Sequence, residues 1–578
     1  MAEEKSLFDL FKEKDKNVSR RLFLKTCGAS VLIAGLPFNL TKLFAANTNL
    51  STATAGNHLT LTWQLDPKTT QTIAWSTDTN ITTGTIQIVK TTAHRNNGWQ
   101  HALSLEAATE LFSTNTGDIN LHYASVTDLT PGTNYTYRVG SNDNWSEAAD
   151  FTTEPKEDTP FKFLVFGDSQ SGLPKNPEYG PWRTTIQNAY AANQDAAFFM
   201  MVGDLVEVGQ DYTHWKNWYD AAKEVIEKIP NMAVPGNHET YDVPEENHSV
   251  LPYYFKEQLR LPGNGPNALK GHVYSFDYGN THFSVIDSQE QEEGQYVPNM
   301  LELEAAWLDK DLAATTKQWK IVLFHKTPYY NKAFRSNEKL KAALTPIIDK
   351  HHVDLVINGH DHGYSRTYPI YQDTFVDTPA KGTIYLVTGR SGNKYYTDLS
   401  QKVWDAFFHD PQAEPNYIVV EIAKTTLTFK AYTQGGNLID VYTIDKVNNT
   451  DLPRTILPER SNDTRLVIWG NMLQTPLINI PPKKIANAWY LPLRSFIEFI
   501  GGEIQSTAAG QIATNYNNTA ITFTLNEQQA ICNNQAAALT APLVLTKGTT
   551  LIAAEDVKNL WKFAYRYDAA TNMLLLAK

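Results

Sequence analysis

Five short blocks of metal-binding residue types, each placed where an apolar run ends, constrain the fold of this chain most strongly. The intervals between the leading residues of neighbouring blocks, 168 to 204, 204 to 237 and 325 to 360, are 36, 33 and 35 residues. Each interval is long enough for a strand–helix–strand unit of about 30 residues or more. The blocks are GDSQ with Asp168, GDLVEVG with Asp204, GNHE with Asn237 and His238, FHKTPYY with His325, and GHDHGYSR with His360 and His362.

This spacing predicts an α/β domain over residues 160–447. The carboxyl ends of the strands in such a fold lie at one edge, so residues far apart in the sequence can meet there. The candidate strands alternate with helical stretches, and they read FKFLVF, AAFFMMV, NMAV, HFSVI, WKIVLF, DLVIN and TIYLV.

The residue types in the blocks predict a site for two metal ions. Asp, Asn and His supply oxygen and imidazole donors that suit Mn, Fe or Zn. His360 and His362 are two residues apart, so in an extended segment both point to the same side and each can serve a different ion. Two ions about 3.5–4 Å apart can clamp a phosphoryl group. A single block is usually an ordinary turn, but five in this order in one region indicate a site.

Two further domains flank this region. Residues 57–153 contain short alternating strands and a Pro131-Gly132 turn, which predicts a β-sandwich without a cluster of titratable residues. Residues 460–578 contain an internal repeat with an offset of 61, which aligns Phe496 with Val557 on two amphipathic helices. Each helix is followed by an alternating strand, so we expect a small duplicated module.

The N-terminus predicts export. The segment SRRLFLK precedes an apolar run that is too short to span a bilayer, and it resembles a twin-arginine signal. We therefore expect residues 1–46 to be a signal peptide that engages the twin-arginine export machinery, with cleavage near Ala46 or retention as an anchor. Because this route carries folded proteins, it suits a protein that acquires metal before export. The expected location is extracellular, periplasmic or at the cell surface.

Composition excludes several classes of function. A net charge of −12 argues against a nucleic-acid-binding protein, which needs a basic face. The only cysteines are Cys27 and Cys532, so removal of the signal leaves one thiol and no intramolecular disulfide.

The five blocks together resemble the calcineurin-like metallophosphoesterases. With the preceding sandwich, which is similar to a fibronectin type III module, and the segment HVYSFDYGNTHFSVID, the chain looks most similar to the purple acid phosphatase branch. The C-terminal repeat resembles the module named after the N-terminal domain of copper amine oxidases, although it contains no cluster of copper ligands. The resemblance implies a multi-domain chain with an N-terminal all-β sandwich, a central α/β/β/α sandwich and a small α+β duplicated module. The last module favours attachment to the cell wall.

The resemblance also implies a role for each site residue. His238 is expected to face the substrate, where it stabilises the phosphoryl charge or protonates the leaving oxygen. Tyr364 and Arg366, in the last block, are further candidates for substrate contact. The implied ligands are Asp168 and His362 for the first metal, Asn237, His325 and His360 for the second, and Asp204 as the bridge between them.

Two positions depart from the family pattern. Purple acid phosphatases have a tyrosine three residues after the bridging aspartate, where this chain has Glu207, and the wider superfamily has a histidine at the position of Gln170. The first metal therefore lacks both usual third ligands, and the purple colour is not expected. This third ligand position can be filled by the Gln170 amide oxygen, by a water molecule that Gln170 orients, or by Glu207. The sequence does not choose between Fe, Mn and Zn as the two metals.

These features predict an exported metal-dependent phosphatase that hydrolyses small phosphate monoesters by attack of a metal-bound hydroxide. A phosphodiesterase or nucleotidase that uses the same site is the alternative among enzymes. A cell-surface binding protein with an inactive phosphatase fold is the alternative from another class.

Overall fold

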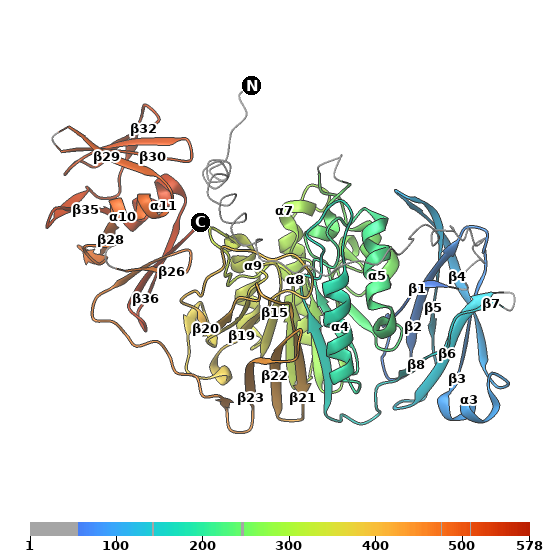
Figure 1. Cartoon of the computed structure of the whole chain (residues 1–578). Helices are drawn as coiled ribbons and strands as arrows, with labels where there is room; N and C mark the ends of the chain where they lie inside the picture. The colour runs from blue at the N-terminus through green and yellow to red at the C-terminus, as the bar shows by residue number, and fades with distance from the viewer. Residues whose placement is uncertain (1–55, 142–143, 244–247, 475–476, 509) are drawn as a thin grey trace, which may run out of the picture. The chain divides into compact units, whose positions relative to one another are not determined.

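The computed structural model describes residues 56–578 except 142–143, 244–247, 475–476 and 509 (Figure 1). The signal predicted over residues 1–46 lies outside the described residues. Within the described part of the chain, no helix has the length and apolar character needed to cross a membrane.

The first domain is an antiparallel β-sandwich. Its long strand β4 pairs with β5 through residues 108–114 and with β3 through residues 103–107, so one strand contributes to both layers. Alternate residues such as Ile86, Tyr137 and Val139 are buried between the layers. The elements are β1 (Asn57–Thr62), β2 (Gln71–Asp78), β3 (Gly84–Lys90), α3 (Thr91–Asn97), β4 (Leu103–Thr114), β5 (Gly117–Val126), β6 (Asn134–Ser141), β7 (Asn144–Trp145) and β8 (Ala149–Thr152).

The central domain contains two seven-stranded sheets, and strands predicted from the sequence occur in both. The first sheet has the order β11-β10-β9-β21-β22-β23-β24, in which β9, β10 and β11 are parallel. Its strands are β9 (Phe161–Phe166), β10 (Phe199–Val202), β11 (Asn231–Val234), β21 (Asn416–Ile422), β22 (Thr426–Thr433), β23 (Leu438–Asp445) and β24 (Thr450–Leu452).

The second sheet has the order β12-β13-β14-β15-β19-β16-β20, with β13, β14, β15 and β19 parallel. A two-stranded ribbon, β17 (Ile370–Tyr371) with β18 (Thr374–Phe375), lies outside it. The strands of the sheet are β12 (Tyr274–Tyr278), β13 (Thr281–Val285), β14 (Trp319–Leu323), β15 (Leu355–Asn358), β16 (Tyr364–Thr367), β19 (Ile384–Thr388) and β20 (Asp405–His409).

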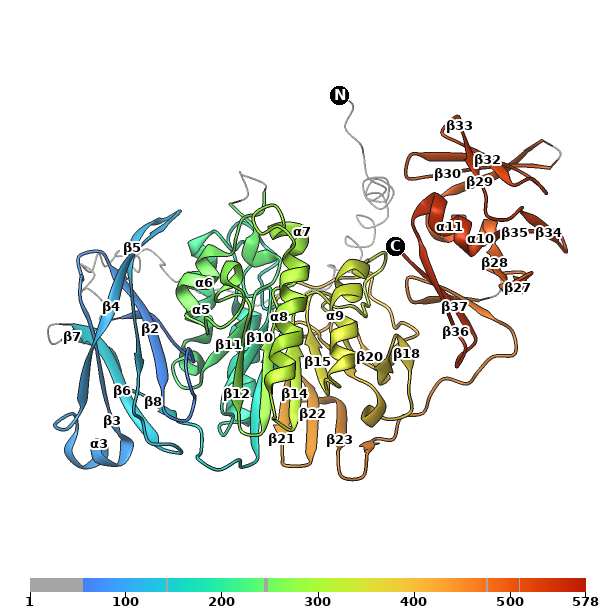
Figure 2. The same cartoon turned by 180° about the vertical axis from the view of Figure 1, so that it is seen from behind.

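Helices cover the outer faces of the two sheets. On one side α4 (Gly180–Ala192) packs with α5 (Tyr212–Ile226), and on the other α8 (Met300–Ala314) packs with α9 (Glu338–Lys350) (Figures 1 and 2). Short helices α6 (Tyr253–Leu259) and α7 (Glu290–Glu293) lie in the connections. Buried apolar side chains from both sheets form one core, which explains why the strand sequences are almost continuously apolar. This is the predicted α/β/β/α arrangement.

The C-terminal module contains the two predicted repeats. Its helices α10 (Leu493–Phe499) and α11 (Ala554–Trp561) each follow one strand of the antiparallel pair β28–β35, in which Leu491 pairs with Ile552, the residue 61 positions later. The pairing therefore relates the repeats to each other. The strands are β25 (Arg465–Ile468), β26 (Asn471–Leu473), β27 (Lys483–Ile485), β28 (Ala488–Pro492), β29 (Glu503–Ala508), β30 (Gln511–Tyr516), β31 (Thr519–Thr524), β32 (Gln529–Cys532), β33 (Gln535–Ala538), β34 (Val544–Thr546), β35 (Thr549–Ala553), β36 (Ala564–Asp568) and β37 (Met573–Ala577).

Candidate metal centre

The predicted ligands lie in short loops that follow β9, β10, β11, β14 and β15. Four of them have a positive φ angle, which is uncommon for residues other than glycine. Such conformations concentrate at functional sites, where the surrounding structure holds them in place. The four angles are 52° at Asp168, 52° at Asp204, 75° at His360 and 59° at His362.

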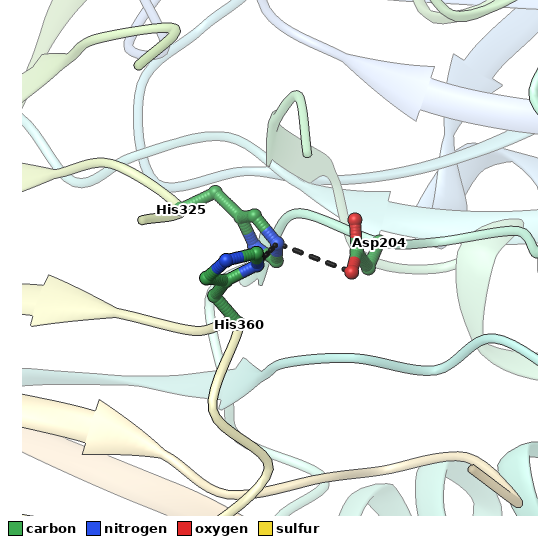
Figure 3. A group of neighbouring side chains, drawn as sticks. All are labelled: Asp204, His325 and His360. Carbon is green, nitrogen blue, oxygen red and sulfur yellow. Dashed lines mark hydrogen bonds and ion pairs between the residues drawn. The ribbon is translucent and has the colours of Figure 1, made fainter. Parts of the chain in front are cut away.

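The loops bring the ligand atoms into two groups that share one residue. Asp204, His325 and His360 form the first group, and Asp168, Asp204 and His362 form the second, with the ligand atoms of each group within 4.8 Å of one another. Figure 3 shows the first group, in which Oδ2 of Asp204 lies 3.2 Å from Nε2 of His325. The shared aspartate has the geometry of the predicted bridging ligand.

Backbone carbonyls fix which nitrogen of each histidine faces the site. His325 Nδ1 donates to Val202 O at 2.8 Å, and His362 Nδ1 donates to Lys394 O at 2.9 Å. In each ring the Nε2 lone pair is then left to face the carboxylates, as metal ligation requires. His360 uses its other nitrogen, because its Nδ1 lies 3.2 Å from His325 Nε2.

The charges in the site favour a cation. Burial alone would lower the pKa of His325, but the carboxylates of Asp204 and Asp168 raise it to about 9. Burial likewise acts to raise the pKa of Asp204, but His325 and His238 hold that pKa below its usual value. Without metal, protonated imidazole therefore takes the positive charge that a metal ion would supply.

Asn237 presents an amide oxygen that no protein group satisfies. Its Nδ2 donates to Tyr241 Oη at 2.7 Å, whereas its buried Oδ1 has no hydrogen-bond partner among the described residues. An orphaned acceptor of this kind is costly unless something outside the protein chain completes it. Together with the imidazoles and carboxylates, it fits the predicted second metal.

Close packing between the loops requires glycine beside the ligands. A Cβ at Gly359 would lie 2.6 Å from Val202 O and 2.8 Å from Asp168 Oδ2. A Cβ at Gly203, where φ is +80°, would collide with the His325 ring. These glycines allow the ligand loops from different strands to touch.

A buried carboxylate, Glu239, organises the loop that carries Asp204. Glu239 Oε1 accepts from the N–H groups of Leu205 and Val206, and Oε2 accepts from those of Asp204 and Gly236, at 2.7–3.1 Å. Burial and then the charge of Asp204 raise the pKa of Glu239 to about 8. No role was predicted for this residue from sequence, although it lies within the GNHE block.

Gln170 and Glu207, the two residues that depart from the family pattern, make different contacts. Gln170 reaches the site, since its Nε2 lies 3.1 Å from Asp204 Oδ2 and 3.3 Å from His362 Nε2. Glu207 is engaged elsewhere: Oε2 accepts from Gly172 N at 2.8 Å, and Oε1 pairs with the Lys394 ammonium at 3.1 Å. Gln170 is therefore better placed than Glu207 to complete the first metal.

His238 lies beside the ligands with a cation against its ring. Its Nδ1 donates to Glu207 O at 2.7 Å, and its Nε2 accepts from Lys394 Nζ at 2.8 Å and lies 3.9 Å from Asp204 Oδ2. Burial lowers the pKa of His238, Asp204 opposes that effect and Lys394 adds to it. This position, adjacent to the ligand groups but in neither of them, agrees with a residue that faces substrate.

A second cation, Arg335, contacts the candidate ligand His360. Asp361 orients it through Nε at 2.8 Å, its Nη2 donates to His360 O at 3.2 Å, and its Nη1 contacts His360 Nε2. Lys394 and Arg335 were both missed from sequence. Neither lies in a recognisable block, and only the fold brings them to the ligands.

Tyr364 and Arg366 do not have the substrate position predicted for them. Tyr364 Oη donates to Asp440 Oδ2 at 3.0 Å, and Arg366 Nε donates to the same oxygen at 2.9 Å. The Arg366 guanidinium also lies over the Tyr442 ring. Because their strand β16 turns this face toward the strand β23 of the other sheet, both side chains link the two sheets. The structure corrects the prediction to a structural role.

Comparisons with known families agree with this architecture. Residues 161–364 match the calcineurin-like phosphoesterase family, residues 57–153 match the N-terminal domain of purple acid phosphatases, and residues 472–576 match the copper amine oxidase N-terminal domain. The three matches confirm the family resemblances predicted from the sequence.

Individual relatives and one solved structure agree with these family matches. Purple acid phosphatase 23 of Arabidopsis thaliana is 26% identical over 315 residues, which cover 48% of this chain and 64% of that protein. An uncharacterised protein of Mycobacterium tuberculosis is 24% identical over 430 residues, or 66% of this chain and 80% of its own length. The structure of purple acid phosphatase PPD1 from yellow lupin covers 68% of this chain and 74% of its own, with a TM-score of 0.53 and 18% identity, and shares the fold.

Proposed function

We propose that this chain, whose central domain is of the calcineurin-like phosphoesterase family, is an exported phosphatase that hydrolyses phosphate monoesters at a two-metal centre. The observation that carries the proposal is the meeting of ligand side chains from four strand ends, with Asp204 common to both ligand groups. The acceptor Oδ1 of Asn237, buried without a partner among the described residues, supports a metal beside it.

A protein assists phosphoryl transfer mainly by positioning the reacting groups and by stabilising charge. Residues of this chain can contribute to both. Bound at the two ligand groups, metal ions would activate water and neutralise charge on the phosphoryl oxygens. Lys394 and Arg335 place cations at the site, and fixed donors of this kind stabilise the charge that develops in the transition state. His238, held by Glu207 O, supports Lys394 and becomes a third charged donor when the pH is low.

The test compares two variants with different expected defects. His238→Ala is expected to keep both metals and to lose turnover of p-nitrophenyl phosphate by a factor of about 10²–10³, as for other charge-stabilising groups. Asp204→Ala is expected to lose metal as well as turnover, because it removes the shared ligand. Metal content by elemental analysis and initial rates are measured on the same preparations, and equal metal loss in both variants would place His238 among the ligands.

A phosphodiesterase acting at the same site is distinguished by its substrate. The wild-type protein is assayed with p-nitrophenyl phosphate and with its bis ester under one set of conditions. A higher kcat/KM for the monoester supports the proposal, and a higher value for the bis ester replaces it with the diesterase alternative.

The departures at Gln170 and Glu207 favour a second candidate, a surface-binding protein with an inactive phosphatase fold. The six ligand positions that the chain retains argue against it, because a binding protein has no physical need for this arrangement. The discriminating result is metal content together with turnover: a metal-loaded protein that hydrolyses neither ester would support the binding protein.

We further propose export by the twin-arginine route and attachment to the cell wall through the C-terminal module. The support is the SRRLFLK segment and the resemblance of the module to one common on bacterial surface proteins. Replacing Arg20 and Arg21 with lysine is expected to retain the protein inside the cell, and unchanged export in cell fractions contradicts the route. A chain ending near Thr450 is expected to leave the wall fraction.

A further inference from the structure

A second group of possible ligands is buried in the central domain, outside the site described above. His272 lies just before β12, Asp287 follows β13, and Glu293 ends α7. Nδ1 of His272 is 3.3 Å from Asp287 Oδ2 and 3.8 Å from Glu293 Oε2, and the three ligand atoms lie within 4.8 Å of one another. Ligands about 2.1 Å from a tetrahedral metal are about 3.4 Å apart, so the spacing suits a single ion.

The polar atoms of this group face one another without hydrogen bonds. The residues His272, Asp287 and Glu293 are 4%, 0% and 0% exposed. His272 Nδ1, both oxygens of Asp287 and both oxygens of Glu293 have no hydrogen-bond partner among the described residues. A buried imidazole nitrogen and buried carboxylates left in this state are strongly destabilising unless a cation or shared protons compensate them.

A further carboxylate, Glu304 on α8, completes the surroundings. Its Oε1 accepts from Asp287 N at 3.0 Å and Ser288 N at 3.4 Å, while its buried Oε2 has no partner among the described residues. Burial and the charge of Asp287 raise the pKa of Glu293 and Glu304 well above the usual value. No lysine or arginine in the described part of the chain forms an ion pair with these three carboxylates, since Lys326 pairs with Glu292 instead.

We propose that His272, Asp287 and Glu293 bind a third metal ion, a divalent transition metal such as Zn²⁺ or Mn²⁺. The imidazole favours these ions over Ca²⁺ and Mg²⁺, which prefer oxygen ligands alone. Because all three ligands are buried, the ion has a structural role. Glu304 holds the Asp287 loop and balances charge from outside the ligand group.

The third ion would stabilise the loop that supports the catalytic ligands. Ser288 Oγ accepts from the N–H of Lys326, which follows His325, at 3.2 Å. Gln289 Nε2 donates to Pro235 O, two residues before Asn237, at 3.3 Å. An ion that holds the segment from Asp287 to Glu293 therefore acts on the position of His325 and Asn237 without contacting substrate.

The first test counts metal in the full chain. Protein stripped with a chelator is reloaded with Zn²⁺ or with Mn²⁺, dialysed, and analysed for metal per chain. We expect three equivalents in the wild type and two in Glu293→Gln and in Asp287→Asn. Glu302→Gln, an exposed neighbour of Glu304 on α8, is the matched control and is expected to keep three. Equal metal counts in the wild type and in both ligand variants would overturn the proposal.

The second test does not depend on catalysis. In an Asp204→Ala background, added Zn²⁺ or Mn²⁺ is expected to raise Tm, since an ion that binds only the folded state stabilises it. The additional change Glu293→Gln is expected to abolish that rise. If Tm does not respond in the Asp204→Ala protein, or responds equally in the double variant, the carboxylates share protons and bind no ion. This outcome is independent of whether the two-metal centre hydrolyses phosphate esters.

Discussion

The ammonium of Lys394 lies 2.8 Å from Nε2 of His238 and 3.1 Å from Oε1 of Glu207. The lysine therefore links the residue that stands where purple acid phosphatases have a tyrosine to the histidine expected to face substrate. At the tyrosine position this chain has a carboxylate that pairs with a cation. We therefore expect Glu207 to position the Lys394 charge and not to bind metal.

Removing this cation should impair turnover and leave metal binding intact. Lys394→Met is expected to lower kcat/KM for p-nitrophenyl phosphate by a factor of about 10–10², because a preorganised charge near the phosphoryl group is lost. Lys394→Arg should recover part of the activity. Lys339→Met serves as control, since that lysine side chain is 82% exposed. A Lys394→Met protein with full activity would exclude a role in catalysis.

The carboxylate of Glu239 is predicted to be a positioning group for the bridging ligand. Glu239→Gln keeps the shape but replaces one acceptor oxygen with an NH₂ group that faces backbone donors. The loss of two hydrogen bonds to this buried acceptor should lower the free energy of unfolding by about 1–3 kcal/mol. Metal affinity should fall as well, because Asp204 N and Gly236 N are among the donors.

Glu302→Gln makes the same chemical change at an exposed position and should alter neither property. The measurements are urea unfolding and metal titration of the stripped protein. Unchanged metal affinity in a Glu239→Gln protein that is less stable would limit Glu239 to a role in folding.

The ligand loops could be predicted from sequence because each follows a strand whose apolar run is unmistakable. The runs FKFLVF and NMAV are β9 and β11 with the same limits as predicted. A glycine and then the ligand follow each run within three residues, so a local pattern is enough to place Asp168 and Asn237. The offset of 61 in the C-terminal repeats was readable for the same reason, since amphipathic helices repeat a local pattern.

Two kinds of contact could not be predicted from sequence. They are the contacts of irregular segments and those of the strand face that packs against the other sheet. Lys394 lies between β19 and β20, and its approach to His238 depends on how that segment crosses the site. Tyr364 and Arg366 follow the GHDH motif, which suggested substrate contact. Their side chains instead meet Asp440, because the pairing of two sheets decides which face of β16 is buried between them.

A buried histidine far from the metal centre predicts a pH-dependent stability. His282 donates to Asp277 at 2.7 Å and to Asp311 at 2.9 Å, and although burial opposes it, these carboxylates raise the pKa of His282 to about 9. A histidine whose pKa is higher in the folded than in the unfolded state stabilises the fold below its unfolded pKa of about 6.5. The stabilisation is lost as the pH rises through about 9.

The measurement is urea unfolding of the wild type and His282→Gln at about pH 6 and about pH 10. Wild type is expected to be more stable by about 1–3 kcal/mol at the lower pH, a range reduced for the exposure of Asp277, and the difference should shrink at the higher pH. A difference that grows with pH would show that His282 is neutral in the folded protein.

The last prediction concerns Gln170, the residue at the usual position of a histidine ligand. Its Nε2 faces Asp204 and His362, while its Oε1 is buried without a partner among the described residues. Rotating the amide by 180° exchanges the two atoms at little cost, and a cation at the first metal position repels the NH₂ group and attracts the oxygen. We therefore expect Gln170 Oε1 to bind the first metal at roughly 2.0–2.4 Å, as other oxygen donors do.

Two substitutions separate ligation from an indirect role. Gln170→Leu removes the donor and should weaken the first metal while the second, bound by Asn237, His325 and His360, remains. Gln170→His supplies imidazole and should raise Zn²⁺ affinity above that of the wild type, because Zn²⁺ prefers nitrogen to a neutral amide oxygen. If Gln170→Leu binds both metals with unchanged affinity, water completes the first metal and Gln170 only orients it. In every case the ferric protein should lack a tyrosinate band, since Glu207 stands where the family's tyrosine would bind; such a band in the visible spectrum would contradict the assignment.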